Sequence, residues 1–143
     1  MLKRDDIEDM GYEYYTTPQS AQRSELHGNT YTPMDMVQEF SRVMQQLPNP
    51  ALYAALIAEE ADEWRSEYLH DTKADQLKEL ADLAYVVFGY ANAKGWDLME
   101  AIARVHKNNI GRCIQPDGSI QRRPDGKVMK NKDYPKVDLN DLV

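Results

Sequence analysis

The fold is constrained most by four stretches of the chain in which apolar residues recur every three to four positions. The first, "TPMDMVQEFSRVMQQL", starts at Thr32 with Pro33 at a first helical position. "PNP" at 48–50 closes this helix and opens a second one, predicted from about Ala51 to Tyr68. Such spacing predicts amphipathic helices that each bury one face.

Turn and cap residues delimit the other two stretches. A short turn at 70–71 leads into "TKADQLKELADLAYVVFGYANAK", for which Asp71 or Thr72 is the predicted N-cap. Gly95 suits the position after this helix, and Asp97 is the predicted N-cap of the fourth stretch, "DLMEAIARVHKNNIGR". The sequence has neither an internal repeat nor strand–helix alternation, so we predict an all-α fold with a four-helix bundle-type core.

The flanking segments follow neither pattern. Residues 1–30 are polar and contain tyrosines without a sustained period, so we predict an arm that becomes ordered by docking. Two Asp-Gly pairs, at 117–118 and 125–126, are strong turn signals and predict an irregular lobe or a small hairpin. The predicted organisation is an arm at 1–30, a helical core at 31–112 and an irregular basic tail at 113–143.

Composition narrows the class of protein. The 143 residues suit one domain, and no apolar run approaches the ~18 residues of a membrane span. Cys113 is the single cysteine and cannot form an internal disulfide, and the N-terminus lacks the apolar core of a secretory signal. We therefore expect a cytoplasmic protein. A net charge of −7 argues against stable nucleic-acid binding.

The charge is distributed unevenly along the chain. Residues 50–96 hold nine acidic side chains against four Lys and Arg, and residues 112–136 hold seven Lys and Arg against three Asp. The acids are densest in "LIAEEADEW" at 56–64. At about 100° per residue, the three glutamates of this segment fall on the arc of the large apolar residues, whereas Asp62 faces the opposite side.

The third predicted helix carries a second acidic pair, with Glu79 on its apolar arc and Asp82 at the edge. No lysine or arginine is expected on the acidic arc of either helix within a turn of these residues. Buried carboxylates lose several kcal/mol of solvation each and repel one another, so either their pKa values rise or cations neutralise them. We predict a site for Mg²⁺, with Mn²⁺ as the alternative ion, on five residues: Glu59, Glu60, Glu63, Glu79 and Asp82.

Two other interpretations of the acids are weaker. A single E-x-x-E on a helix is usually a solvated face, but two acidic pairs on adjacent helices, both at the apolar arc, favour a metal. A di-iron carboxylate bundle requires Glu-x-x-His pairs, and neither His70 nor His106 stands three residues after a glutamate.

An acidic metal site together with a basic, turn-rich tail suits a polyphosphate substrate. The sequence has no Gly-rich phosphate loop of the G-x-x-x-x-G-K-[ST] kind, so a P-loop enzyme is excluded. It also has no persuasive serine or cysteine nucleophile. Water activated by the metal is the expected attacking group.

The motif E-E-x-x-E at 59–63, with E-x-x-D at 79–82, resembles the all-α nucleoside triphosphate pyrophosphohydrolases. These include MazG-like proteins, dimeric dUTPases and phosphoribosyl-ATP pyrophosphohydrolase. "ELADLAYVVFGYA" looks like the third helix of the MazG-like branch, "VHKNNIGR" is similar to its helix-four ending, and "DGKVMKNKDYPKVDL" looks like its lysine-rich loop. The resemblance covers roughly residues 33–139. Ile110-Gly111-Arg112 replaces the usual Met-Ser-Lys, so arginine would meet phosphate there.

The resemblance implies Mg²⁺-dependent hydrolysis of a nucleoside triphosphate to the monophosphate and pyrophosphate, with water attacking the α-phosphorus. The carboxylates other than Glu59 would hold the metal, and Glu59 would join them or act as general base. The implied substrate-binding residues are Asn109 at the sugar or base, with Arg112, Lys127 and Lys130 at the phosphates. Lys107 is a weaker candidate.

Several alternatives stay open at this point. Asn109 could be a plain C-cap, and Lys127 and Lys130 could simply keep a loop in solution. The whole chain could be a non-catalytic helical module that binds Mg²⁺-nucleotide or a protein, or a hydrolase specific for dUTP or phosphoribosyl-ATP. The lysine-rich tail argues against phosphoribosyl-ATP. Apolar faces on several sides, together with the family's habit, predict a homodimer or tetramer with active sites completed across the subunit boundary.

Overall fold

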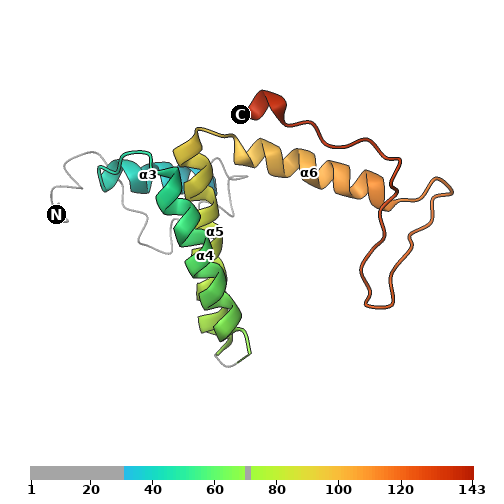
Figure 1. The fold of residues 1–143 in the computed structure, drawn as a ribbon, viewed down its shortest axis with the longest axis horizontal. Coiled ribbons are helices and arrows are strands. Elements are labelled where there is room, and N and C mark those ends of the chain that lie inside the picture. Colours follow the sequence, from blue (N-terminus) through green and yellow to red (C-terminus); the bar gives the residue numbers. More distant parts are fainter. Residues whose placement is uncertain (1–30, 70–71) are drawn as a thin grey trace. The chain divides into compact units, whose positions relative to one another are not determined.

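The computed structural model describes residues 31–69 and 72–143 and is shown in Figure 1. These residues form α-helices, one short 3₁₀ helix and an isolated antiparallel bridge, without strands, so the predicted all-α fold is confirmed. The predicted arm at 1–30 and the turn at His70–Asp71 lie outside the described residues. The described elements are α3 (Pro33–Val43), α4 (Pro50–Glu67), α5 (Lys73–Lys94), α6 (Leu98–Cys113) and η1 (Asn140–Leu142).

Local capping chemistry sets where the helices begin. The Thr32 side chain accepts a hydrogen bond from the backbone N–H of Asp35, whose carboxylate accepts one from the Thr32 backbone in return. Asn49 caps α4 through a 3.1 Å bond from the Leu52 N–H, and this helix starts at Pro50, one residue before the predicted start. At the start of α5, the Asp75 N–H donates to the hydroxyl of Thr72, one of the two predicted caps.

The described chain divides into two compact units, one ending at Lys94 and one starting at Gly95. Gly95 has a φ of +71°, the left-handed conformation predicted for the residue that follows the helix. Asp97 then caps α6, as predicted, by accepting a hydrogen bond from the Glu100 N–H. The predicted boundary between 112 and 113 rests on composition rather than compactness and stays a prediction.

In the first unit, α4 and α5 lie side by side, and α3 packs against α5 (Figure 1). The contact depends on Gly89, because a Cβ there would lie 2.1 Å from the ring of Tyr53. The same tyrosine is buried and donates its hydroxyl hydrogen to Gln46 at 3.1 Å. Val37 of α3 belongs to the buried apolar core and is only 1% exposed. Large and small side chains thus interdigitate where α4 and α5 meet.

In the second unit, α6 holds the C-terminal segment through polar contacts along its length. Asn108 donates to the carbonyl of Pro135 at 2.8 Å, and Arg104 forms a forked pair with Asp141 at 2.6 and 2.8 Å. Gly111 leaves the space that the Tyr134 side chain occupies, because an added Cβ would lie 2.1 Å from the tyrosine hydroxyl. These contacts hold the last part of the tail against α6.

The tail contains a small hairpin, one of the two forms that the Asp-Gly pairs predicted. Arg122 and Val128 form an antiparallel bridge, and the turn between them includes Gly126 at a φ of +86°. Throughout the described chain, no helix is both long and apolar enough to cross a membrane.

Candidate metal centre

Three carboxylates come together where the second half of α4 faces the first half of α5. Glu60 of α4 and Glu79 and Asp82 of α5 each offer one oxygen, and these three oxygens all lie within 4.8 Å of one another. Glu79 and Asp82 are three residues apart and so lie on one face of α5, while Glu60 reaches them from the neighbouring helix. We call these three residues the carboxylate cluster.

Two oxygens of the carboxylate cluster are buried without a partner. The Oε2 atoms of Glu60 and Glu79 have no hydrogen-bond partner among the described residues. A buried acceptor that loses its water and gains nothing costs about 1–3 kcal/mol, and more when it is charged. Such atoms therefore point to something that binds here.

Electrostatics at Glu60 leads to the same conclusion. Its pKa is raised above the ordinary value of 4.5, first by burial and then by the charges of Glu63, Asp82, Glu79 and Glu59, in that order. The other four predicted carboxylates thus all act on Glu60. A bound cation would reverse this repulsion and favour the ionised form of Glu60.

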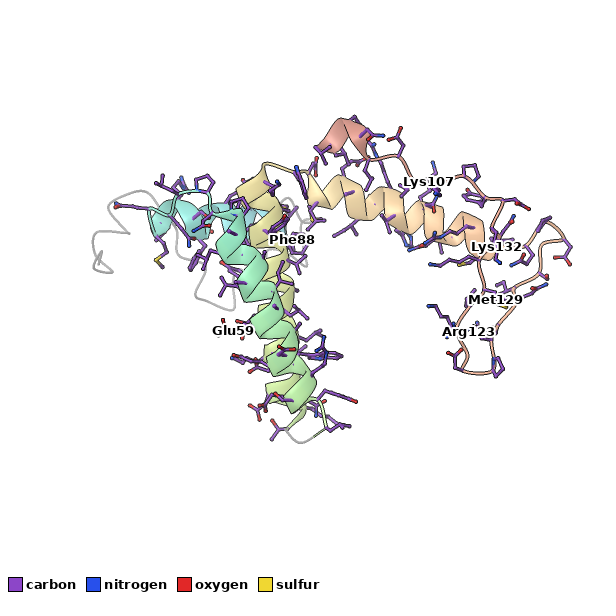
Figure 2. The ribbon with its side chains drawn as sticks, viewed as in Figure 1. Glu59, Phe88, Lys107, Arg123, Met129 and Lys132 are labelled. Carbon is purple, nitrogen blue, oxygen red and sulfur yellow. The ribbon has the colours of Figure 1, made fainter. Side chains whose placement is uncertain are left out.

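Glu59 and Glu63, the other two predicted ligands, are exposed and lie outside the carboxylate cluster, so their role as ligands stays a prediction. The expectation that all three glutamates of α4 lie inside the apolar stripe was wrong. The face of α4 that α5 covers is centred on Tyr53, Glu60 and Trp64, which leaves the other two glutamates at its solvent edge. Figure 2 shows Glu59 projecting sideways from α4. Wheel angles locate the apolar residues but not the centre of the contact with α5.

The expectation about cations concerned only the acidic arc, whereas a lysine outside that arc reaches the acids. The Nζ atom of Lys78 lies 3.0 Å from Oε1 of Glu79 and 2.9 Å from Oδ2 of Asp82. These hydrogen bonds raise the pKa of Lys78, with the bond to Asp82 contributing most. Its backbone stands outside the acidic arc, but a four-carbon side chain spans the distance to a residue four positions later.

The cluster fits a hard divalent cation. Its donors are carboxylate oxygens only, which is the ligand type that Mg²⁺ and Mn²⁺ prefer, and two of them have no hydrogen-bond partner in the described chain. Soft or imidazole-preferring metals are not favoured, since no histidine or cysteine belongs to this group of ligands.

The second unit holds the residues predicted to bind substrate. Asn109 lies one turn inside α6, which continues to Cys113, so it is not a C-cap. Its Oδ1 atom accepts hydrogen bonds from Nε and Nη2 of Arg112, at 3.1 and 2.7 Å. The amide oxygen of Asn109 therefore fixes the guanidinium, a contact that the sequence pattern did not predict although the spacing of three residues permits it.

The two predicted phosphate-binding lysines are exposed in the tail. Lys127 lies in the hairpin, where its N–H donates to Asp125 at 3.1 Å, and Lys130 follows the hairpin. The backbone N–H of Asn131 donates to the carbonyl of Arg112 at 2.6 Å, which places the chain next to Lys130 beside the end of α6. Figure 2 shows the neighbouring residues Met129 and Lys132 of this segment. Lys107 of α6 is exposed as well.

Comparison with known proteins places this arrangement in a family. The family model of phosphoribosyl-ATP pyrophosphohydrolase matches residues 34–109, more than half of the chain. The chain belongs to this family. The match includes every member of the carboxylate cluster as well as Asn109, and it ends before the tail. No curated protein matches the chain.

Membership in the family confirms the resemblance to the all-α pyrophosphohydrolases. It supports pyrophosphohydrolase activity on nucleotides in general. The matched region includes α4 and α5, which carry the carboxylate cluster, so the family assignment and the geometry concern the same part of the molecule.

Proposed function

We propose that this protein hydrolyses (deoxy)nucleoside triphosphates to the monophosphate and pyrophosphate, with Mg²⁺ as its cofactor and Mn²⁺ as a substitute. The observation that carries the proposal is the carboxylate cluster, in which the Oε2 atoms of Glu60 and Glu79 are buried and lack partners in the described chain. A structural cluster would gain nothing from this arrangement, whereas a metal-binding one requires free oxygens.

The cluster residues Glu60, Glu79 and Asp82 would hold the metal, and Glu63 would join them from the solvent edge of α4. The bound ion would activate water and neutralise charge that develops on the phosphate oxygens. Glu59 is the proposed general base or a further ligand. It is adjacent to Glu60 but exposed, which leaves its carboxylate accessible to a water molecule outside the cluster.

Three cationic side chains of the second unit are the proposed phosphate-binding residues: Arg112, Lys127 and Lys130. The two bonds from Arg112 to Asn109 hold the guanidinium plane in one orientation, which suits recognition of phosphate oxygens. Asn109 keeps its amide NH₂ group for the sugar or base, because only its oxygen is used by Arg112. The exposure of both lysines leaves their ammonium groups accessible to an anion.

We further propose a homodimer or tetramer, whose active sites are completed across the subunit boundary. Support comes from large apolar side chains that remain exposed on α5, such as Leu77 at 67% and Leu80 at 48%. Light scattering at micromolar concentration tests this, and a clean monomer contradicts it. We propose the cytoplasm as the location of the protein. In the proposed organisation, residues 31–112 form the catalytic core, residues 113–143 form the phosphate-contacting tail, and residues 1–30, which lie outside the described part of the chain, form an arm.

A second candidate substrate is phosphoribosyl-ATP, and the family match favours its inclusion in any assay. A panel of NTPs, dNTPs including dUTP, and phosphoribosyl-ATP, each with Mg²⁺, separates these options by pyrophosphate release. Faster pyrophosphate release from phosphoribosyl-ATP than from the other compounds would identify phosphoribosyl-ATP as the substrate. The absence of release from every compound would favour a non-catalytic nucleotide- or protein-binding module.

The same assay tests the carboxylate cluster. E60Q and D82N each remove one charged ligand with little change in volume, and we expect each to lower kcat by about a hundredfold or more. D62N is the matched control, because Asp62 is exposed and pairs with Arg65 at 2.9 Å rather than with the cluster. Unchanged turnover in E60Q and D82N would overturn the catalytic assignment.

A further inference from the structure

The proposed function assigns no role to Lys78, although this lysine contacts the carboxylate cluster. Its ammonium lies 3.0 Å from Oε1 of Glu79 and 2.9 Å from Oδ2 of Asp82, so it binds two of the three residues proposed to hold the metal. The side chain of Lys78 is 66% exposed, against 13% for Glu79. The lysine thus contacts the cluster from its solvent side and can leave without disturbing the packing of α4 on α5.

We propose that Lys78 is a displaceable counter-cation, which neutralises part of the carboxylate cluster in the metal-free protein and gives way when a divalent cation binds. This inference rests on the proposed function, since it concerns the same metal site. It assigns Lys78 a regulatory role, in which the lysine sets the concentration of Mg²⁺ at which the site fills. It assigns no contact with substrate.

The charges explain why a lysine alone does not satisfy the cluster. One ammonium supplies a single positive charge to three carboxylates, with Glu59 and Glu63 adding their negative charge nearby. The Oε2 atoms of Glu60 and Glu79 still lack a partner in the described chain while Lys78 occupies the outer oxygens. A divalent cation brings twice the charge and can approach the inner oxygens as well.

The lysine and the ion also compete directly. Both require Glu79 and Asp82, and a cation on these carboxylates would repel an ammonium about 3 Å from them. An exposed ion pair is weak on its own, so a side chain this flexible is displaced at small cost. The repulsion nevertheless adds to the free energy that the incoming ion must overcome.

The decisive measurement is the affinity for Mg²⁺ and for Mn²⁺, by titration calorimetry, of the full-length protein without nucleotide. We expect K78M to bind each ion about fivefold to tenfold more tightly than the unsubstituted protein, because both the competitor and its charge are gone. K78R keeps the charge and can still span the two carboxylates, so its affinity should stay within about twofold of the original.

R65M is the matched control for a simple change in net charge. It removes one cation from α4, two positions after Glu63, but that arginine pairs with Asp62 rather than with the cluster. Solvent screening should limit its effect to about twofold. Thermal melting adds a second readout: without metal K78M should melt at a lower temperature than R65M, and saturating Mg²⁺ should abolish this difference.

The outcomes separate the two proposals. If the unsubstituted protein binds the ions and K78M binds them no more tightly, or less tightly, Lys78 is not displaced and only this inference fails. An equal gain in R65M and K78M would also overturn it, since the effect would be one of net charge. If no variant binds either ion, the proposed metal site fails and the role of Lys78 fails with it.

Discussion

The two ends of the α4–α5 pair are built from the same two helices and differ in how completely their groups are matched. Near Tyr53 and Gly89, ring and glycine fit together, and the tyrosine hydroxyl finds Gln46. Two turns further along α4, Glu60 meets Glu79, and each keeps a buried oxygen without a partner in the described chain. At the first, apolar end the polar group has a hydrogen-bond partner, whereas at the second, acidic end two carboxylate oxygens have none in the described chain.

The difference shows how the free energy of folding supports the site. Tight packing at the apolar end fixes the distance between α4 and α5, and this holds like charges close together further along the same helices. The cluster by itself raises the free energy of the fold, as the raised pKa of Glu60 indicates. The apolar end therefore stabilises a carboxylate arrangement that becomes favourable only with a cation.

The largest effect is expected from neutralising one carboxylate of the cluster. E60Q should weaken Mg²⁺ binding by about a hundredfold or more and at the same time raise the melting temperature of the metal-free protein, because one buried charge and its repulsions disappear. Calorimetry and thermal melting measure the two changes. D62N should alter neither, and a metal-free E60Q less stable than the original would contradict the account of the cluster.

Disrupting the packing of Tyr53 on Gly89 at the apolar end should lower the free energy of unfolding. G89A places a Cβ 2.1 Å from the Tyr53 ring and should destabilise the protein by about 1–3 kcal/mol, measured by urea denaturation. In a Y53A background the ring is absent, so most of the cost of G89A should vanish. Equal costs in both backgrounds would show that the alanine acts without meeting the tyrosine.

A cap at the apolar end should contribute less. N49A removes the side chain that accepts from the Leu52 N–H and should lower the free energy of unfolding by about 1 kcal/mol. N49D keeps an accepting oxygen and should retain most of the stability. Neither change should shift the affinity for Mg²⁺, and a loss of affinity in N49A would mean that the two ends are more tightly coupled than the local hydrogen bond implies.

The smallest expected effect is a dependence on pH of the stability that E60Q gains in the metal-free protein. Since the pKa of Glu60 is raised in the folded protein, the folded state binds more protons than the unfolded one between 4.5 and that raised value. The contribution of Glu60 to stability is therefore present at low pH and is lost as the pH rises from 4.5 through the raised pKa. Without metal, the melting temperature of E60Q should exceed that of the original protein by more as the pH increases. A constant difference across this pH range would contradict this.

Much of the fold followed from local sequence. Thr32, Asn49, Asp97 and Gly95 act on backbone groups within three or four residues of themselves, so their roles do not depend on distant parts of the chain. The pairing of Glu79 with Asp82 across one helical turn is local in the same sense. Helical spacing was sufficient to place both acidic segments on α4 and α5.

Other features of the site required knowledge of which surfaces meet or of how far a side chain reaches along its own helix. The helical wheel could not tell that α5 covers the side of α4 centred on Glu60, and so leaves Glu59 and Glu63 exposed. It also missed Lys78, because it follows Cβ directions and not the reach of a long side chain. The bonds between Arg112 and Asn109 likewise depend on rotamers that the sequence does not show.

The sequence by itself determined the helices, their ends and the presence of two acidic segments, because hydrogen bonds and caps act over three or four residues. Only the tertiary structure decided which carboxylates form the cluster and which oxygens lack a partner. These depend on the rotation of α4 against α5, which is set by the fit of Tyr53 on Gly89.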